Sequence, residues 1–435
     1  MNVVFFGFGK SYLFYEKLLS KTNFFKKITF ICQTSTYKKY YDQINPSYNN
    51  IYIDKIKIKE SDCLNINSSL IDSDKKRFVN KSGIFKEKYY GSVYVYLKNK
   101  LKIINPDLIF FSQSVESPES LIIYKISKEL NLKSIFPHWF RFLGGSYFSY
   151  SPYEGEENFN LSKSTKLKDG INLNHNGLPY FFDLPERLYP KFTFFKSIKN
   201  FLKLILSGSN NLSIKIFYVR LENILRLKYY YKLKIFCQNI FLKKKYLNKI
   251  PDNDFIFFPL QYTPESSINI SSPYYIDQIR LIDEIRYNLK EGNLLLIKEH
   301  PSMIGRRNYK FYKQILNKSY VRIINPKIKT LDIIKKSKCV VSISGSASLE
   351  AFLFGIPSIS ISKTFFSKFL LNNIENLRRD EFEIPQTNYI NRVINTFYTN
   401  SKNFHLFATD YWKIVDDKNI DEVLISLKHK LLNKL

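Results

Sequence analysis

Two stretches of the chain alternate short apolar runs with segments of helical periodicity. In the first 140 residues the predicted strands are Val3–Phe8, Ile28–Gln33, Leu108–Ser112 and Ser134–Pro137, with helices near 10–20 and 118–130. Between residues 254 and 362 the predicted strands are Phe255–Leu260, Leu294–Lys298, Val321–Ile324, Cys339–Ile343 and Ser358–Ile361, with helices at 273–290, 308–317, 329–337 and 347–354. Strand–helix–strand order with short links favours parallel, doubly wound sheets. We therefore expect an α/β protein with two Rossmann-type domains.

The segments outside these two stretches have a different texture. Residues 144–182 are rich in loop-forming Gly, Ser, Asn and Asp, and they contain the acidic cluster Glu154, Glu156 and Glu157. The tail, 405–435, has the periodicity of two helices. The predicted organisation is an N-terminal domain over 1–185 with the loop 144–182, a basic amphipathic helical connector over 186–250, a C-terminal domain over 251–400, and C-terminal helices over 401–435.

Composition narrows the class of protein. Hydrophobic residues make up 44% and aromatic residues 17% of the 435 residues, which excludes wholesale disorder. The four cysteines have neither metal nor redox spacing, and Cys32 and Cys339 fall within apolar runs, so we expect buried free thiols and no metal site. Nothing indicates an oxidising compartment.

The N-terminus indicates a strand and not a signal peptide. No basic region precedes its apolar run, and Gly7, Gly9 and Lys10 interrupt that run early. Gly7-Phe8-Gly9-Lys10 is half of a dinucleotide-binding fingerprint without the third glycine, which more often marks a tight βα turn. No uncharged apolar run approaches the roughly 18 residues that a spanning helix needs. We expect a cytoplasmic protein.

The net charge of +29 is concentrated in one region. From Glu186 to Lys249 there are fifteen Lys or Arg and two Glu, which carry +13 of the total. Apolar side chains recur there at helical spacing with lysines opposite, a pattern typical of helices on an anionic bilayer. We expect peripheral contact of 191–249 with the inner face of the inner membrane, with a connector packed on its own protein as the alternative. The chain is rich in Lys, Asn, Ile, Tyr and Phe together, as expected when an AT-rich genome biases codon use, and this bias accounts for part of the charge. No nucleic-acid partner is expected.

Candidate chemistry gathers where strands of the second stretch end. The strand at 339–343 is followed by Ser344-Gly345-Ser346-Ala347-Ser348, which opens a helix. Free N–H groups and the positive end of a helix dipole favour an anion at such a loop. Glu350 follows in the first turns, and a capping box would need a serine at position 347, where Ala347 stands. We expect Glu350 to accept ribose hydroxyls beside a phosphate held by the loop.

A second neighbouring strand ends at Lys298-Glu299-His300-Pro301. Proline stops the strand and leaves His300 at the sheet edge, where its imidazole can donate to a phosphate oxygen or protonate a leaving group. A histidine that merely caps the next turn is the alternative. Arg306 and Arg307 can clamp a phosphate or a sugar carboxylate, and one of the two is expected to be only a surface charge.

The strand at 255–260 runs into Gln261-Tyr262-Thr263-Pro264-Glu265-Ser266-Ser267. In a parallel sheet this loop lies at the same edge as His300 and Ser344. Gln261 can read a nucleobase, and Glu265 can act as a base or accept a hydroxyl. A loop that only caps the following helix is equally favoured by the pattern.

These residues resemble the bacterial capsule polysaccharide biosynthesis glycosyltransferases of the Kps type, which are GT-B enzymes related in motif to bacterial sialyltransferases and Kdo transferases. The matching segments are FFPLQYTPESS (257–267), Asp277-Gln278, LLIKEHP (295–301), Gly305-Arg306 and SISGSASLEAFLFGIP (342–357). They cover about a quarter of the chain directly. The glycine–serine–glutamate segment is shared by many GT-B enzymes, whereas its combination with Lys-Glu-His-Pro is more specific.

The resemblance implies two facing Rossmann-like domains, no metal and no cofactor besides the nucleotide-sugar donor. It implies that His300 and Ser344/Ser346 hold the donor phosphate. The full set of residues that we expect to bind the donor is Gln261, Glu265, Lys298, His300, Pro301, Arg306, Arg307, Ser344, Gly345, Ser346, Ser348 and Glu350. CMP-activated 3-deoxy acids, such as Kdo or sialic-type sugars, would give an arginine a carboxylate to bind. The acceptor would be a glycan or glycolipid.

The catalytic acid motif of related sialyltransferases lies in the N-terminal domain. Its nearest counterpart here is Tyr153-Glu154-Gly155-Glu156-Glu157, which departs from the strict order of that motif and leaves the general base open. In the predicted mechanism His300 holds the donor phosphate and Glu154 or a neighbour deprotonates the acceptor hydroxyl. Sequence does not decide between a retaining and an inverting outcome.

Two other functions remain open at this point. A UDP-N-acetylglucosamine 2-epimerase-like enzyme would need further acids and histidines at the cleft, and only His138 and His175 are spare in the N-terminal half. A non-catalytic, membrane-associated factor for capsule assembly or export would have no nucleotide affinity.

Overall fold

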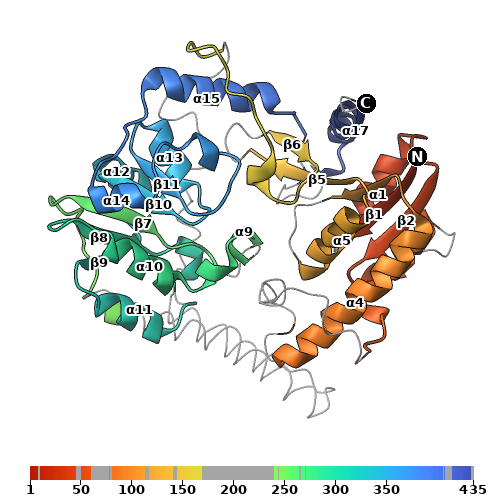
Figure 1. Ribbon diagram of the computed structural model, residues 1–435, viewed down its shortest axis with the longest axis horizontal. Coiled ribbons are helices and arrows are strands. Elements are labelled where there is room, and N and C mark those ends of the chain that lie inside the picture. Colours follow the sequence, from red (N-terminus) through yellow and green to blue (C-terminus); the bar gives the residue numbers. More distant parts are fainter. Residues whose placement is uncertain are drawn as a thin grey trace, which may run out of the picture.

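The structure is a computed structural model of the chain (Figure 1). It describes residues 1–7, 10–45, 50–59, 78, 81–112, 117–140, 145–168, 240–242, 244–263, 266–269, 271–304, 306–404, 406 and 414–432. Most of the expected basic connector, including residues 191–239, therefore lies outside the described residues, as do Glu265, His175, Cys63 and Cys237.

The N-terminal domain is built on a six-stranded sheet in the order β3-β2-β1-β4-β5-β6. Its strands are β1 (Asn2–Gly7), β2 (Lys27–Cys32), β3 (Ile51–Tyr52), β4 (Leu108–Phe111), β5 (Ser134–Trp139) and β6 (Ser146–Ser149). All neighbours pair in parallel except β5 and β6, which are antiparallel. The helices are α1 (Tyr12–Ser20), α2 (Lys38–Ile44), α4 (Gly83–Ile104) and α5 (Pro118–Glu129), with short 3₁₀ turns η1 (Ser35–Tyr37), η2 (Ile53–Lys55) and η4 (Glu154–Glu156).

The continuous apolar run of β1 follows from burial on both faces of this sheet. Val3 and Phe5 pack with α1, whereas Val4 and Phe6 pack with α4 and α5. A strand covered on both sides needs apolar side chains at every position, so it lacks the alternation of a half-exposed strand.

The C-terminal domain has a five-stranded, all-parallel sheet in the order β11-β10-β7-β8-β9. Its strands are β7 (Phe255–Pro259), β8 (Leu294–Lys298), β9 (Val321–Ile324), β10 (Cys339–Ser342) and β11 (Ser358–Ser360). Its helices are α9 (Ser266–Asn269), η7 (Pro273–Ile276), α10 (Gln278–Tyr287), η8 (Pro301–Met303), α11 (Tyr309–Leu316), α12 (Thr330–Lys336), α13 (Ala347–Leu353), η9 (Ser367–Phe369), α14 (Ile374–Arg379) and α15 (Thr387–Asn400). Chain order reverses between β7 and β10, and ligands bind doubly wound sheets outside the carboxyl ends of the strands at such a reversal.

An aromatic cluster joins the two domains. Phe140, Tyr147 and Phe159 of the N-terminal domain pack against Phe365 and Phe397 of the C-terminal domain. The ring centroids of Phe140 and Phe365 are 5.4 Å apart, and those of Phe140 and Phe397 are 5.6 Å apart. The apolar contact fixes the end of β5 against the segment that follows β11.

The last helix returns to the first domain. In Figure 1 the C-terminal helix α17 (Asp417–Leu432) lies beside the N-terminal strands. Ile420, Val423 and Leu427 enter the core formed by β1 and α1, and Lys21 forms ion pairs with Asp417 at 3.0 Å and Asp421 at 2.9 Å. The chain's end is thus part of the N-terminal body.

The predicted fold class is confirmed: both stretches form doubly wound sheets, and every predicted strand is present with ends shifted by one or two residues. The elements differ from the prediction in three ways. The helix predicted at 273–290 is divided into η7 and α10, and Ser146–Ser149 within the expected loop form strand β6. The elements α2, β3, α4, α14 and α15 fall where the sequence patterns predicted none. Only one helix of the predicted C-terminal pair, α17, lies within the described residues. Cys32 and Cys339 are buried free thiols, as predicted.

Candidate functional site

His300 stands directly after β8 and begins η8. Its Nδ1 accepts a hydrogen bond from the Ser302 main-chain N–H at 3.2 Å, so the capping role considered as an alternative is present. Because Nδ1 is the acceptor, the neutral ring carries its proton on Nε2. Burial, together with the charges of Arg307 and Lys298, lowers the pKa of His300 to about 4. At neutral pH the site therefore offers an uncharged N–H donor.

Glu299 and Arg307 form a buried ion pair beside this histidine. Arg307 Nε is 2.8 Å from Glu299 Oε2, and both side chains are less than a tenth exposed. Glu299 also accepts from Tyr312 Oη at 2.7 Å and from the His300 main-chain N–H at 2.7 Å. Arg307 reaches across to the loop after β7, where it donates to Thr263 Oγ1 at 3.2 Å and to the Gln261 carbonyl.

These contacts change the role expected of Arg307. Sequence predicted a guanidinium that clamps the ligand, but the Arg307 guanidinium ties the loop after β7 to the loop after β8. One of the two arginines was expected to be only a surface charge. Arg307 is not that residue, because its partner Glu299 is buried. We therefore treat Arg307 as a residue that positions the site.

Arg306 is the exposed member of the pair. Its Nη1 donates to Tyr262 Oη at 3.2 Å, and its guanidinium lies 5.9 Å from the centroid of the Tyr262 ring. The Tyr262 and His300 rings are 6.0 Å apart. Tyr262, His300 and Arg306 thus form one polar and aromatic face, which we call the ligand face, at the carboxyl ends of β7 and β8.

Gln261 links this face to the serine-rich loop after β10. Its main chain pairs with the Gln278 side chain, with N–H to Oε1 at 3.0 Å and Nε2 to the carbonyl at 3.1 Å. Its own side-chain amide lies over the serine loop: the oxygen accepts from the Ser344 N–H at 2.9 Å and from the Gly345 N–H, and the nitrogen faces Ser344 Oγ at 3.2 Å. A Cβ at Gly345 would be 2.6 Å from this amide, which explains the glycine.

Two sequence expectations are revised by that contact. Gln261 was expected to read a nucleobase and the Ser344 and Gly345 amides to hold a phosphate, yet in this structure they bind each other. The loop is also internally bonded: Ser342 Oγ and Ser348 Oγ are 2.7 Å apart and lie 3.1 and 3.3 Å from the Gly345 carbonyl, so one hydroxyl donates to the carbonyl and the other to its neighbouring hydroxyl. Ser348 is fully buried, so it shapes the loop instead of facing a ligand.

Glu350 and Lys298 are both buried, and each shifts the pKa of the other through its charge. Burial raises the pKa of Glu350 to about 7, opposed by the Ser346 hydroxyl, which donates to Oε1 at 2.9 Å, and by the charge of Lys298. Burial lowers the pKa of Lys298 to about 8. The Lys298 ammonium donates to the Ile328 carbonyl at 2.6 Å and to Thr330 Oγ1 at 2.7 Å, so it fastens β8 to the start of α12.

The Ser346–Glu350 contact is a helix-end interaction but not the capping box that the sequence analysis excluded on spacing. Ser346 is the N-cap of α13. Its hydroxyl donates to the Glu350 carboxylate one turn later and does not accept from a main-chain N–H, as it would in a capping box. Pro301 is buried at the first position of η8, where it ends β8.

The acidic segment of the N-terminal domain contacts the C-terminal domain. Glu157 pairs with Lys430 of α17 at 2.5 Å, and its carbonyl accepts from Lys368 at 3.2 Å. Gly155 lies so close to Lys363 that a Cβ would meet the Lys363 main chain at 2.8 Å. Glu156 is exposed and accepts from the Ser151 hydroxyl.

This contact places the acids at one end of the C-terminal sheet edge. Lys363 follows β11, which neighbours β10 and its serine loop, whereas His300 follows β8. With strands about 4.8 Å apart, β11 and β8 are separated by about 14 Å along the sheet. A nucleotide-sugar is long enough to span that interval.

The sequence analysis missed Glu299 and Tyr262. The signal for Glu299 was available, because it lies between Lys298 and His300 directly after a strand whose alternate side chains are buried on both faces. Tyr262 offered no signal, since its neighbours become clear only when the loops after β7 and β8 meet. Among the described residues no three His, Cys, Asp or Glu side chains gather as metal ligands, and no helix is long and apolar enough to cross a bilayer.

Solved structures similar to this chain include two kinds of sugar-processing enzyme. The beta Kdo 2,7 transferase of Thermosulfurimonas dismutans KpsC is 11% identical with a TM-score of 0.35, covering 90% of each chain. The UDP-GlcNAc 2-epimerase of Methanocaldococcus jannaschii, solved with UDP-GlcNAc and UDP, is 14% identical with a TM-score of 0.26, covering 92% of this chain and all of the other. No family model and no curated protein matches. The fold assignment rests on the strand orders described above.

Proposed function

We propose that this chain is a metal-independent GT-B glycosyltransferase of surface polysaccharide biosynthesis. It moves a sugar from a nucleotide-sugar to a glycan or glycolipid acceptor. The observation that carries the proposal is the ligand face, where a neutral N–H donor, a guanidinium and an aromatic ring meet at the carboxyl ends of β7 and β8, next to the reversal between β7 and β10.

The donor's phosphate belongs at this face. As the bond between the sugar and the phosphate oxygen breaks, negative charge grows on the leaving nucleotide. Arg306 and the His300 Nε2–H stabilise that charge by electrostatics and hydrogen bonding. With a pKa near 4, His300 is already neutral at pH 7, so it binds as a donor and is a poor general acid. If the donor is a CMP-activated 3-deoxy acid, Arg306 also has a sugar carboxylate to bind.

The acceptor hydroxyl loses its proton to an N-terminal carboxylate. Glu157 is held by Lys430, which leaves Glu154 and Glu156 as the candidate bases. Their segment lies next to the end of β11, on the serine-loop side of the sheet edge. To Glu350, whose pKa is close to 7, we assign the role of accepting hydroxyl groups of a bound nucleoside.

The epimerase alternative stays the second candidate function, because it requires the same fold. It needs additional acids and histidines at the cleft, and His138 is 1% exposed with Nε2 2.8 Å from the Ser151 carbonyl. His175 lies outside the described residues. Peripheral membrane contact through 191–249 stays a prediction, and indifference of the purified protein to anionic liposomes at low salt would count against it.

Thermal shift measurements with CMP, UDP, GDP and their sugars test the proposal. We expect one nucleotide class to raise the melting temperature of the wild type and of Lys310→Ala, a matched exposed cation on α11, but not that of His300→Ala. A CMP response supports a 3-deoxy-acid donor, and a UDP or GDP response replaces that donor class. No response from any of them would overturn the enzyme proposal in favour of an assembly factor.

A further inference from the structure

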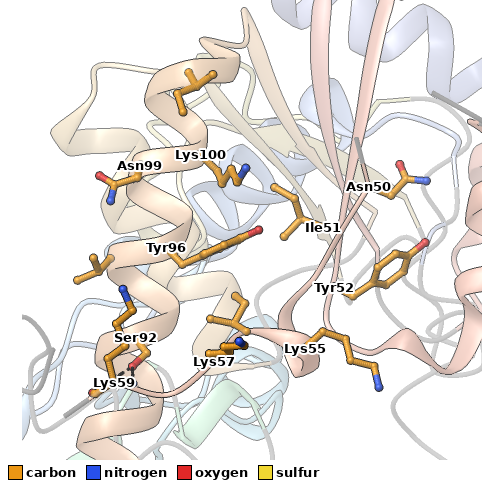
Figure 2. Close-up of a pocket in the computed structure, with 13 residues that line it drawn as sticks. Asn50, Ile51, Tyr52, Lys55, Lys57, Lys59, Ser92, Tyr96, Asn99 and Lys100 are labelled. Atoms are coloured by element: carbon orange, nitrogen blue, oxygen red, sulfur yellow. Dashed lines mark hydrogen bonds between the residues drawn. The ribbon is translucent and has the colours of Figure 1, made fainter. Parts of the chain in front are cut away.

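The N-terminal domain has a basic pocket of about 560 Å³ that the proposed reaction does not use. It lies between α4 and the segment formed by the edge strand β3, η2 and residues 56–59. Figure 2 shows Tyr96 and Lys100 reaching from α4 toward Ile51 of β3. Its volume falls within the roughly 300–1,000 Å³ of pockets that hold small ligands.

The pocket combines an apolar floor with exposed cations. Ile51, Ile56 and Val95 line the floor, and the exposed Tyr96 ring borders it. Lys57 comes from the segment after β3 and Lys100 from α4. Asn50 and Tyr52, which also border the pocket, already bond to Asp42 at 2.9 and 2.7 Å.

These lysines have no acidic neighbour in the part of the chain that the structure describes. Within it, no acidic side chain lines the pocket, and neither Lys57 nor Lys100 has a carboxylate partner. Other lysines nearby do: Lys98 of α4 pairs with Glu129 at 2.6 Å, and Lys38 pairs with Asp42 at 2.7 Å. Uncompensated cations facing a shared hollow attract an anion from solution.

The shape selects the kind of anion. A bilayer surface is flat, whereas these cations line a hollow that apolar side chains also line. A sugar ring has apolar C–H faces that pack on aromatic and aliphatic side chains, and its carboxylate or phosphate groups pair with lysines. The free amide of Asn99, exposed at the pocket, suits a sugar hydroxyl.

We propose that this pocket binds an acidic glycan segment and serves as a docking site for the acceptor chain away from the ligand face. The inference rests on the proposed transferase function for the identity of the glycan as acceptor. The binding itself does not depend on catalysis, because the pocket's residues lie in the N-terminal domain and none belongs to the loops after β7, β8 or β10.

Calorimetry with a short oligogalacturonate, compared with a maltooligosaccharide of equal length, tests the inference on the full chain. We expect binding of the acidic oligomer only, weakened at least about tenfold in Lys57→Glu/Lys100→Glu, in proportion to two lost charge pairs and two repulsions. Tyr96→Ala should weaken it by about threefold or more through lost packing. Lys102→Glu, an exposed change on the same helix outside the pocket, should leave affinity within about twofold.

The outcomes separate this inference from the proposed function. Nucleotide-induced thermal shifts, measured on the same variants, should persist in Lys57→Glu/Lys100→Glu and vanish in His300→Ala, while oligogalacturonate binding should behave in the opposite way. Equal affinity in Lys57→Glu/Lys100→Glu and Lys102→Glu would overturn the docking site, and so would binding to phosphatidylglycerol vesicles without any to the oligomer. Loss of the nucleotide response alone would overturn only the proposed function.

Discussion

Arg306 and Arg307 are consecutive in the chain, yet they belong to two regions with opposite physical character. Arg307 lies in a buried bracket, which we define as Glu299, Arg307 and Gln261, where each polar group has protein partners. Arg306 lies on the ligand face with Tyr262 and His300, and its guanidinium is exposed. The polar groups of the bracket bond to each other and hold two loops together. The donors of the ligand face stay available to solvent or to a ligand.

The comparison teaches how a site is preorganised. The loops after β7, β8 and β10 carry no regular hydrogen-bond ladder between them, so side chains must fix their spacing. The buried bracket fixes that spacing, and the exposed groups are held in position because they lie on the same loops. A ligand then meets donors that are already in place, which lowers the ordering cost of binding.

Removal of Arg307 should have the largest effect and separate the two regions most clearly. Arg307→Ala leaves the Glu299 carboxylate buried and unpaired, which costs about 3–5 kcal/mol in the free energy of unfolding. Arg306→Ala should stay within about 0.5 kcal/mol, as is typical of exposed positions. Urea denaturation of both variants measures the difference.

A paired substitution is the control for this first prediction. Glu299→Leu/Arg307→Met removes both charges, so it should destabilise less than Arg307→Ala alone. Similar losses for Arg306→Ala and Arg307→Ala would show that the division into bracket and face is wrong.

Arg306→Ala should instead act on binding. A hydrogen bond to a charged group contributes about 1.5–3 kcal/mol, so nucleotide affinity should fall by roughly 10- to 100-fold with an unchanged melting temperature of the free protein. Isothermal titration with the nucleotide identified by thermal shift provides the measurement. Lys310→Ala is the matched control, and an equal loss there would reduce Arg306 to a general contribution of positive charge.

Gln261→Ala tests whether the bracket also covers a hidden anion site. The substitution removes the amide that occupies the Ser344 and Gly345 N–H groups, and it should cost about 1–2 kcal/mol in unfolding free energy. It should also free those amides, so affinity for inorganic phosphate should rise or stay constant. A fall in phosphate affinity would indicate that the glutamine itself binds the anion.

The sequence predicted the sheets well and the site only in part, for a physical reason. Strands such as β8 are specified by local apolar runs, and loop residues such as His300 follow from where those runs end. The difference between Arg306 and Arg307 depends on Glu299 and on the loop after β7. That loop is 36 or more residues away from Glu299 in sequence. Helix α4 escaped because its aromatic and β-branched segment YYGSVYVY suits a strand locally, and burial between β1 and α5 overrides that preference.

The smallest expected effect concerns pH. Burial and two neighbouring cations give His300 a pKa of about 4, below the 6.5 of a free imidazole, so the ring stays neutral from pH 8 down to pH 6. Affinity for a nucleotide-sugar, whose phosphodiester does not titrate in this range, should therefore be flat between pH 6 and 8. His300→Gln keeps an N–H donor and should retain part of the binding that His300→Ala loses.

The lowered pKa of His300 also predicts how the free energy of unfolding depends on pH. Between pH 6.5 and 4 the unfolded chain binds a proton at position 300 that the folded protein rejects, so the stabilisation present above pH 6.5 is lost as the pH falls through this window. The loss should be smaller in His300→Gln, whose side chain does not titrate. Affinity that rises several-fold from pH 7 to pH 6 in the wild type, but not in His300→Gln, would mean that a charged imidazole binds the phosphate, and His300 would then share the cationic role assigned here to Arg306 alone.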